Sequence, residues 1–382
     1  MRRLKLMLII MMMFIILCSY QTRSYADDFQ TNRLANKLQQ GLDKKVKELE
    51  VPGIQASVRV NDDYWFSASG SVDFEKEKKL TTKHSFRIGS VTKIFTAAII
   101  MKLYENGEIN LDDKINKWFP EFPKSDIVNV RQLLNHSSGI YNYTENLWFN
   151  LKTVLFSKKI WNPNTLLKST YNKQFYFTPG DSHLYSNTNY LMLGLIIEKL
   201  TGESLAKIYR KHIFEPFELK NTFFVPYEKI PENLITGYDR DIISFGIQEY
   251  TSKENSFATY GFSAGAIVST SEDLRRWIDN LFKSDFISQD TLNEMKQYLK
   301  ANDPDVREQV GYGLGLRVLE ICGDKIYGHT GTIPGFGAAV FYCPDKDYSI
   351  VVVSNISMFA QIDVLKELIS IINEHNVEKK SN

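Results

Sequence analysis

A serine and a lysine three positions apart, Ser90 and Lys93, are the first pair in this chain that could do chemistry together. The segment from Ser90 to Tyr104 is apolar on most sides, which predicts a buried helix. Residues three apart share a helix face, so the Lys93 amine can approach the Ser90 hydroxyl, and the helix N-terminus offers N–H groups to an oxyanion. The other interpretation is an N-capping serine beside a lysine that reaches solvent.

A second polar motif, Tyr185-Ser186-Asn187, follows a loop and precedes a segment with one apolar helical face. A loop in that position can present side chains into a cleft. The same Tyr-x-Asn spacing recurs at Tyr104 and Asn106, so this motif decides nothing alone.

A third motif, His329-Thr330-Gly331-Thr332, ends a predicted strand and runs into a glycine-containing segment. Glycine there allows a backbone to approach a ligand closely. Arg317, on the preceding strand, is either an anchor for a substrate carboxylate or a solvated arginine.

The elements that must position these motifs lie near both ends of the chain. Alternating apolar residues predict strands at 54–60, 64–66, 311–321, 325–329, 338–342 and 348–354. Helical spacing predicts a helix before them, at 29–49, and another after them, at 362–372. We therefore expect an α/β (α+β) fold, in which an antiparallel sheet flanked by N- and C-terminal helices carries a mainly helical inserted domain.

The domain boundaries follow from this pattern. We expect a sheet domain from residues 27–109 and 305–376, a mainly helical domain from residues 110–304, and a disordered tail from residues 377–382. Residues 1–26 have a basic start, an apolar run and small residues at Ser24 and Ala26, which is typical of a cleavable signal peptide. A retained anchor is the alternative. Export would place the protein in the periplasm or the extracellular cell-envelope space.

Charge and composition exclude several classes of protein. The 382 residues are 43% hydrophobic and 24% charged, which argues against a disordered chain. The net charge of +1 gives no field to hold a phosphate backbone, so we expect no nucleic-acid partner. Cys322 and Cys343 end predicted strands and can form a disulfide or remain buried thiols.

Taken together and in this order, the three motifs resemble the signature of the penicillin-recognising serine enzymes: DD-peptidases, class C β-lactamases, D-aminopeptidases and esterases. Further similar segments lie at Phe86 to Lys93, Leu133 to Gly139, Ser263 to Gly265 and Gly328 to Phe336. The resemblance covers roughly residues 30 to 375 and implies a β-lactamase/transpeptidase-like fold.

The family mechanism, carried over by motif, implies a role for each residue. Ser90 is the acylated nucleophile, Lys93 helps to deprotonate it, and Tyr185 is a general base or proton shuttle whose phenolate a cationic Lys93 would favour. Asn187 would hold the substrate amide carbonyl. The N–H groups of Ser90 and Thr332 would form the oxyanion hole, with the Thr330 and Thr332 hydroxyls facing a substrate carboxylate.

One departure from the family pattern concerns the branch. Class C β-lactamases usually begin the third motif with lysine, whereas this chain has His329, which resembles certain exported DD-carboxypeptidases. With its usual pKa of about 6.5, the histidine would titrate at about pH 6 to 7 and be mostly neutral at pH 7. The site would then hold one cation fewer than with lysine, so we expect a poor β-lactamase.

The predicted function is thus an exported serine hydrolase that forms a Ser90 acyl-enzyme, with a D-alanyl-D-alanine carboxypeptidase or a related peptidase or esterase favoured. A class C β-lactamase and a penicillin-binding sensor with little turnover are the alternatives. The resemblance implies a small peptide, amide or ester substrate, with a peptidoglycan stem peptide or a β-lactam among the candidates. We expect no cofactor, no metal and a monomer.

Three other features are weaker candidates. Gly261 to Gly265 fits the nucleophile elbow of α/β-hydrolases, but no hydrophobic strand precedes Ser263. The segment from Glu215 resembles a class A β-lactamase loop but has Lys220 where asparagine is expected. His136 is interpreted as a hydrogen-bonded loop residue.

Overall fold

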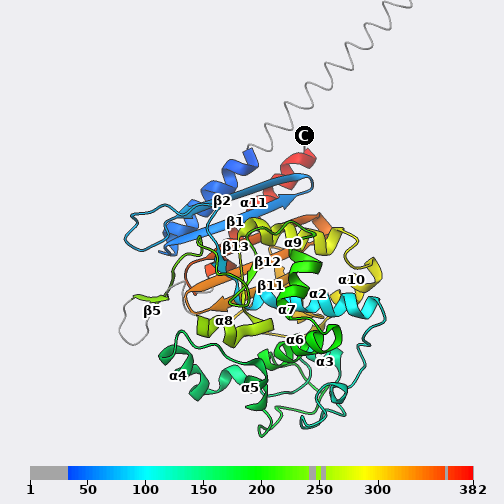
Figure 1. The fold of residues 1–382 in the computed structure, drawn as a ribbon. Helices are drawn as coiled ribbons and strands as arrows, with labels where there is room; N and C mark the ends of the chain where they lie inside the picture. The colour runs from blue at the N-terminus through cyan, green and yellow to red at the C-terminus, as the bar shows by residue number, and fades with distance from the viewer. Residues whose placement is uncertain (1–32, 241–246, 251–254, 358–359, 382) are drawn as a thin grey trace, which may run out of the picture.

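An eight-stranded antiparallel sheet forms the centre of the computed structural model, which describes residues 33–240, 247–250, 255–357 and 360–381 (Figure 1). The strand order is β2-β1-β13-β12-β11-β10-β9-β8, so strands from the two ends of the chain pair through β1 and β13. The strands are β1 (Gly53–Val60), β2 (Asp63–Gly70), β8 (Leu299–Lys300), β9 (Gln309–Tyr312), β10 (Arg317–Ile321), β11 (Asp324–Ile333), β12 (Phe336–Cys343) and β13 (Tyr348–Ser354). The predicted fold class is confirmed.

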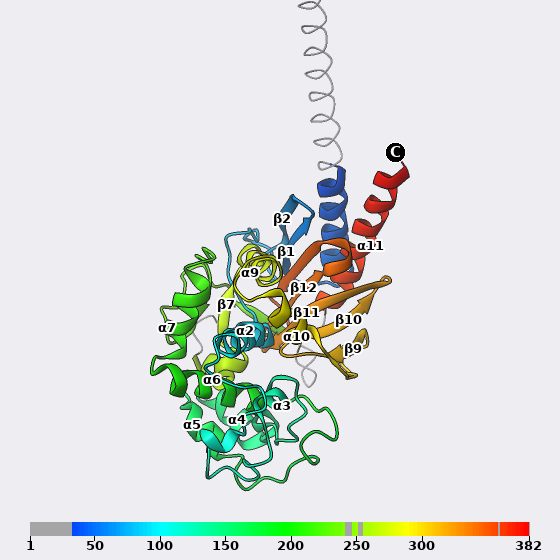
Figure 2. The same ribbon diagram turned by 90° about the vertical axis from the view of Figure 1, so that its right-hand side faces the viewer.

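Helices cover both faces of the sheet, as Figure 2 shows. The helix of residues 33–48 and α11 (Ala360–Ser381) lie side by side on one face. On the other face α9 (Ser271–Lys283) packs against β1, β12 and β13. In β13, Ile350 and Val352 join the core under α11, whereas Val351 and Val353 join the core on the opposite face. Burial on both faces explains why residues 350–353 of this strand form a continuous apolar run.

The remaining helices form a second layer below the sheet. Its centre is α2 (Thr92–Glu105), which lies between β11 and α6 (Asn187–Thr201). The others are α3 (Val130–Leu134), α4 (Leu147–Leu155), α5 (Pro163–Lys168), α7 (Leu205–Tyr209), α8 (Asn255–Gly261) and α10 (Gln289–Lys296). Shorter helical turns are η1 (Gly89–Val91), η2 (Ile115–Lys117), η3 (Tyr143–Glu145), η4 (Arg210–Phe214), η5 (Phe262–Ala264) and η6 (Pro344–Lys346).

Two small sheets complete the fold. One contains β3 (Phe86–Arg87), β7 (Ile267–Ser269) and β4 (Phe223–Phe224), and the other pairs β5 (Gly237–Arg240) with β6 (Ile247–Tyr250). The predicted boundary at residue 304 does not match this arrangement, because α9 and β8 belong with the central sheet. The amphipathic pattern of α9 identified a helix but not which layer it covers.

The strand predicted at residues 311–321 is two strands, because a tight turn separates β9 from β10. Tyr312 pairs with Arg317 across this turn, and the Gly313 N–H donates to Leu316 O at 2.7 Å. Gly315 has a φ of +86°, and a β-carbon there would lie 2.2 Å from the Ala97 β-carbon of α2. The apolar alternation does not indicate this turn. The turn requires glycine because a side chain there would collide with α2.

The disordered tail expected at residues 377–382 is wrong up to Ser381, because α11 continues through that residue. Glu378 lies in ion-pair contact with Lys37 at 3.1 Å and with Arg33 at 3.4 Å, which joins the tail to the helix of residues 33–48. The predicted signal peptide lies outside the described residues. Within the ranges described above, no helix is both long and apolar enough to cross a membrane. Cys322 and Cys343 are free thiols, one exposed and one buried.

Candidate active site

Ser90 lies in the turn η1 that leads directly into α2, at a point where strand β11 touches the backbone. A β-carbon at Gly331 would lie 2.0 Å from Ile88 O and 3.0 Å from Ser90 N. Gly89 has a φ of +48°, and a β-carbon there would lie 3.0 Å from Thr332 O. Glycine on both sides therefore lets the Ser90 turn and the Thr332 backbone meet without intervening side chains.

Lys93 is fully buried beneath Ser90 and holds three polar contacts. Its Nζ lies 3.0 Å from Ser90 Oγ, 2.7 Å from Asn187 Oδ1 and 2.9 Å from Ala264 O. Burial holds the pKa of the Lys93 amine well below its usual value, and the positive charge of Arg317 lowers it further. The lowered pKa shifts the amine toward its neutral form. Its complete burial rules out the interpretation of Lys93 as a lysine that reaches solvent.

Asn187 begins α6 and connects the helical layer to Lys93. Its Oδ1 accepts from Lys93, and its Nδ2 donates to Thr144 Oγ1 at 3.0 Å. Both ends of the side-chain amide are therefore engaged within the protein. The role predicted for Asn187, binding the substrate amide carbonyl, requires the Thr144 contact to be exchanged for the substrate.

Tyr185 lies beside Lys93, with the amine 4.9 Å from the centre of its ring. Its hydroxyl oxygen is buried, and among the described residues none makes a hydrogen bond of normal geometry with it. Burial raises the pKa of Tyr185 to about 12, although Arg317 and Ser90 partly offset the rise. The expectation of a phenolate favoured by Lys93 is therefore wrong, because burial raises the pKa of Tyr185 by more than the neighbouring groups lower it. Tyr104, the other Tyr-x-Asn tyrosine, lies at the far end of α2.

His329 is fully buried in β11 and is absent from the surfaces of the two cavities described below. Its Nε2 lies 2.8 Å from Tyr312 Oη, and its Nδ1 contacts Thr330 O. Burial, with a smaller effect of Arg317, holds the pKa of His329 well below its usual value. The expectation that it titrates near pH 6 to 7 is wrong. The structure brings it close to the site but not into contact with the space for substrate.

The ring of His136 packs against the ring of Tyr185, with the two ring centres 4.3 Å apart. It is buried, lies 3.2 Å from Tyr312 Oη, and accepts a hydrogen bond from Ser186 N at 3.2 Å through Nδ1. These contacts agree with its interpretation as a hydrogen-bonded loop residue.

Arg317 is not a solvated arginine, because its side chain is only 7% exposed. Its Nη1 lies 2.6 Å from Asp303 Oδ2 and also contacts Gln309 Oε1, and its guanidinium stands 5.2 Å from the Tyr185 ring centre. Arg317 therefore reaches the site, but with its charge already paired.

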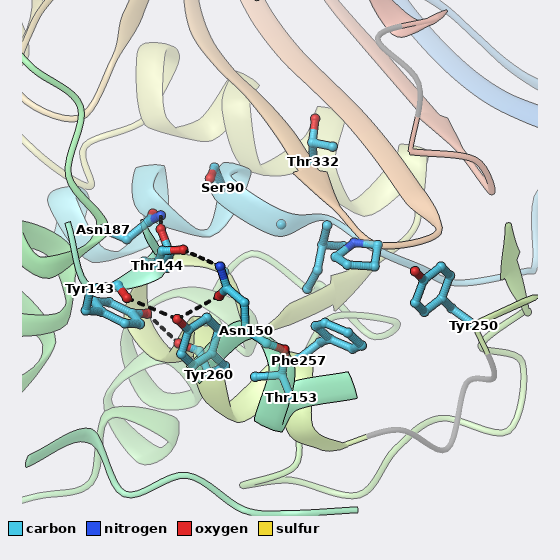
Figure 3. A pocket seen from close by; sticks show the side chains of 16 residues that line it. Ser90, Tyr143, Thr144, Asn150, Thr153, Asn187, Tyr250, Phe257, Tyr260 and Thr332 are labelled. Atoms are coloured by element: carbon cyan, nitrogen blue, oxygen red, sulfur yellow. Dashed lines mark hydrogen bonds between the residues drawn. The ribbon is translucent and has the colours of Figure 1, made fainter. Parts of the chain in front are cut away.

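Two cavities meet at Ser90, Asn187 and Thr332. The first, of about 380 Å³, is walled by Tyr143, Thr144, Asn150, Tyr250, Phe257, Tyr260, Ile333 and Pro334, among others. Figure 3 shows Ser90 and Thr332 on one side of it and Asn150, Tyr260 and Phe257 on the other. We call this the aromatic cavity.

The second cavity, of about 350 Å³, is lined by Ser90, Tyr185, Asn187, Thr330, Thr332, Arg317, His183, Leu184 and the loop of residues 302–305. We call this the polar cavity. Tyr185, Thr330 and Arg317 line only the polar cavity. Apart from the buried Lys93 and His329, the predicted site residues that can donate a proton or carry a charge therefore face the polar cavity or the place where the two cavities meet.

Several residues of the site carried no signal in the sequence. Asp303 pairs with Arg317 from an unremarkable acidic loop, and Thr144 binds Asn187 from a turn with no motif. Ala264 lies in a segment identified by the family resemblance, but nothing in the sequence indicates its carbonyl contact with Lys93. Ser263, the alternative nucleophile, is buried, donates to Tyr190 O at 2.7 Å, and follows helix α8 rather than a strand.

Comparison with known proteins agrees with this geometry. The family model described as Beta-lactamase matches residues 35–366. The chain is 30% identical over 300 residues to penicillin-binding protein 4* of Bacillus subtilis. This alignment covers 75% of this chain and 64% of that protein. The chain thus spans 64% of the length of the first curated relatives that it matches.

Two solved structures share the fold. A D-stereospecific amidohydrolase from Streptomyces is 31% identical, with a TM-score of 0.75, over 85% of this chain and 94% of that chain. The D-amino acid amidase of Ochrobactrum anthropi SV3, solved with L-phenylalanine amide, is 26% identical, with a TM-score of 0.83, over 90% of this chain and 99% of that chain. The chain belongs to the beta-lactamase family, the penicillin-recognising serine enzymes.

Proposed function

We propose that this protein is a serine hydrolase that forms an acyl-enzyme at Ser90 and cleaves amides or esters of D-amino acids, D-alanyl compounds included. The observation that carries the proposal is the buried Lys93 amine, which lies 3.0 Å from Ser90 Oγ with a pKa well below its usual value. The D-amino acid amidase and D-stereospecific amidohydrolase neighbours support the substrate class.

Acylation begins with proton transfer from Ser90 to Lys93. A neutral amine has two N–H donors and one lone pair, and Asn187 Oδ1 and Ala264 O are acceptors that occupy the donors. The lone pair is then directed at the Ser90 hydroxyl. Lys93 takes that proton as Ser90 Oγ forms a bond to the substrate carbonyl carbon, and the carbonyl oxygen becomes an oxyanion.

The oxyanion is stabilised by the backbone N–H groups of Ser90 and Thr332. The contacts of Gly89 and Gly331 bring these two backbone segments together. Such donors are fixed before the reaction, so they cost no reorganisation when the charge develops, and losing one typically lowers the rate by about 100- to 1,000-fold.

Tyr185 supplies a proton to the leaving group. A pKa of about 12 keeps its hydroxyl protonated at neutral pH, and that hydroxyl has no competing partner of normal geometry in the described residues. As the bond between the carbonyl carbon and the leaving group breaks, Tyr185 donates its proton and regains one from the Lys93 ammonium. Water then attacks the ester on Ser90, with the same groups acting in reverse.

The two cavities divide the substrate. The leaving group must reach Tyr185, which lines only the polar cavity, so the acyl group occupies the aromatic cavity. Residues 1–26 support export to the cell-envelope space as part of the same proposal.

The test combines acylation with turnover. Purified protein labelled with a fluorescent penicillin, and a panel of D-alanyl amides, esters and thioesters, is compared with Ser90→Ala and with Ser182→Ala, an exposed serine in the loop before Tyr185. We expect Ser90→Ala alone to lose both labelling and turnover. Labelling of Ser90→Ala equal to that of the wild type would exclude the mechanism. Labelling without turnover of any substrate would indicate a penicillin-binding sensor, and efficient hydrolysis of cephalosporins alone would indicate a β-lactamase.

A further inference from the structure

We propose that the polar cavity selects neutral or cationic leaving groups and disfavours a leaving group that ends in a free carboxylate, because Asp303 already occupies the charge of Arg317. This inference rests on the proposed acyl-enzyme mechanism and specifies its substrate class. It separates amides and esters of D-amino acids from peptides that end in D-alanine.

The charges that line the polar cavity add up to an acidic surface. Arg317 is its one permanent cation, and Asp303 and Asp305 are its two carboxylates. His183, the remaining titratable base in the lining, has its pKa lowered by burial to about 4, so it carries no charge at neutral pH. The lining therefore bears a formal charge of −1 where the leaving group must lie.

The pairing of Asp303 with Arg317 is built into the fold. The ion pair is 2.6 Å long, with side chains that are 7% and 18% exposed, and Gln309 holds the same guanidinium nitrogen. Asp303 is fixed in turn, because its Oδ1 accepts from Asp305 N at 3.0 Å and its carbonyl oxygen accepts from Val306 N at 3.0 Å.

A substrate carboxylate would have to compete with this arrangement. To pair with Arg317 it must displace a well-held, largely buried carboxylate or accept a position beside Asp303 and Asp305. Placing like charges together in a partly desolvated cavity is costly, and this is how binding sites reject unwanted ligands. A carboxamide, an alcohol or an amine-bearing group meets no such repulsion, and a cationic group gains attraction to Asp305.

The experiment uses one acyl group with three leaving groups. N-acetyl-D-alanine is joined through an amide bond to D-alanine, to D-alaninamide or to ethylenediamine, so the ends carry a negative, a neutral and a positive charge. The kcat/KM of each is measured for the full-length protein. We expect the neutral and cationic compounds to exceed the carboxylate compound by about tenfold or more, the change that a single close charge typically produces.

Variants locate the cause of this preference. Asp303→Asn frees Arg317 and is expected to raise the kcat/KM ratio of the carboxylate compound to the neutral compound by about tenfold. Asp303→Glu keeps the charge and the preference, and Asp62→Asn, at an exposed turn after β1, leaves the ratio unchanged. Thermal unfolding and penicillin labelling confirm that each variant is folded. If Asp303→Asn does not fold, the wild-type series and Asp305→Asn, which is expected to shift the ratio in the same direction, decide.

The outcomes separate the two proposals. Preference of the wild type for the carboxylate compound, or an unchanged ratio in folded Asp303→Asn, overturns the inference and leaves the acyl-enzyme mechanism standing. Failure of every compound together with failure of penicillin labelling overturns the proposed function itself and the inference with it.

Discussion

The Lys93 amine lies 2.7 Å from Asn187 Oδ1, a neutral acceptor, and burial holds the pKa of this amine well below its usual value. Because an amide oxygen carries no net charge, it orients Lys93 without strongly favouring the ammonium form. A carboxylate in the same place would do so.

Asn187→Asp is therefore expected to raise the pKa of Lys93 and move the activity to more alkaline pH. At neutral pH we expect kcat to fall by about 100-fold, with partial recovery as the pH rises. The pH dependence of turnover measures this directly. Thr144→Ser, which keeps the hydroxyl partner of Asn187, is the control. A loss of activity in Asn187→Asp that is equal at all pH values would show that Asn187 does not act through the charge of Lys93.

The wild-type enzyme is expected to show a single acid limb in its pH profile. Lys93 must be neutral, so activity falls as the pH decreases through its lowered pKa, whereas Tyr185, with a pKa of about 12, keeps its proton on the alkaline side. The rate should then stay level up to about pH 10. His329→Gln should leave the position of the acid limb unchanged, even if the rate falls. An alkaline limb near neutral pH would contradict the assignment of Tyr185 as a proton donor.

The two Tyr-x-Asn tyrosines give a matched pair of variants. Tyr185→Phe removes the proton donor and should lower turnover by at least about 100-fold, while the protein stays folded. Tyr104→Phe, at the end of α2, should change turnover by less than about threefold. Steady-state kinetics and thermal unfolding of both variants test this, and equal effects would remove Tyr185 from the mechanism.

Acid should destabilise the folded state through the histidines near the site. Burial lowers the pKa of His183 from 6.5 to about 4 and those of His136 and His329 well below 6.5. The unfolded chain therefore binds protons that the folded chain does not. Their contribution to stability is present above about pH 6.5 and is lost as the pH falls toward the folded-state pKa values.

Urea denaturation between pH 7.5 and pH 5 measures this effect. His183 alone contributes up to about 3 kcal/mol between pH 6.5 and 4, of which about 2 kcal/mol is lost by pH 5. His183→Gln should therefore reduce the slope of the free energy of unfolding against pH. Parallel slopes for the variant and the wild type would show that His183 is not held neutral by the fold.

The three motifs that meet at the candidate site could be identified from the sequence, but the electrostatics of the site could not. Ser90 and Lys93 are close in the chain, and their spacing on a helix already implies contact. The protonation state of Lys93, by contrast, depends on complete burial under residues of α6 and η5, which lie far away in the sequence. The protonation state of Tyr185 could not be predicted either, because its environment comes from several separate elements.

His329 and Arg317 show what strand patterns leave open. Alternation predicts which face of β11 carries His329. It does not predict that the His329 ring contacts Tyr312, which belongs to β9. Arg317 looked equally suited to solvent or to a substrate, and the residue that decides, Asp303, lies in a loop with no periodicity. The sequence does not indicate the turn at Gly315, because flanking apolar residues continue the alternation through it.

The junction of the two cavities at Ser90 also determines what can accept the acyl group. Once the leaving group departs, the aromatic cavity remains filled and the polar cavity is vacant, so the next nucleophile enters where the last group left. By microscopic reversibility, Tyr185 can then accept a proton from an amine that resembles the departed group. In concentrated amine solutions the enzyme should therefore make new amide bonds in competition with water. Uncharged amines such as D-alaninamide should be joined readily, and free D-alanine poorly.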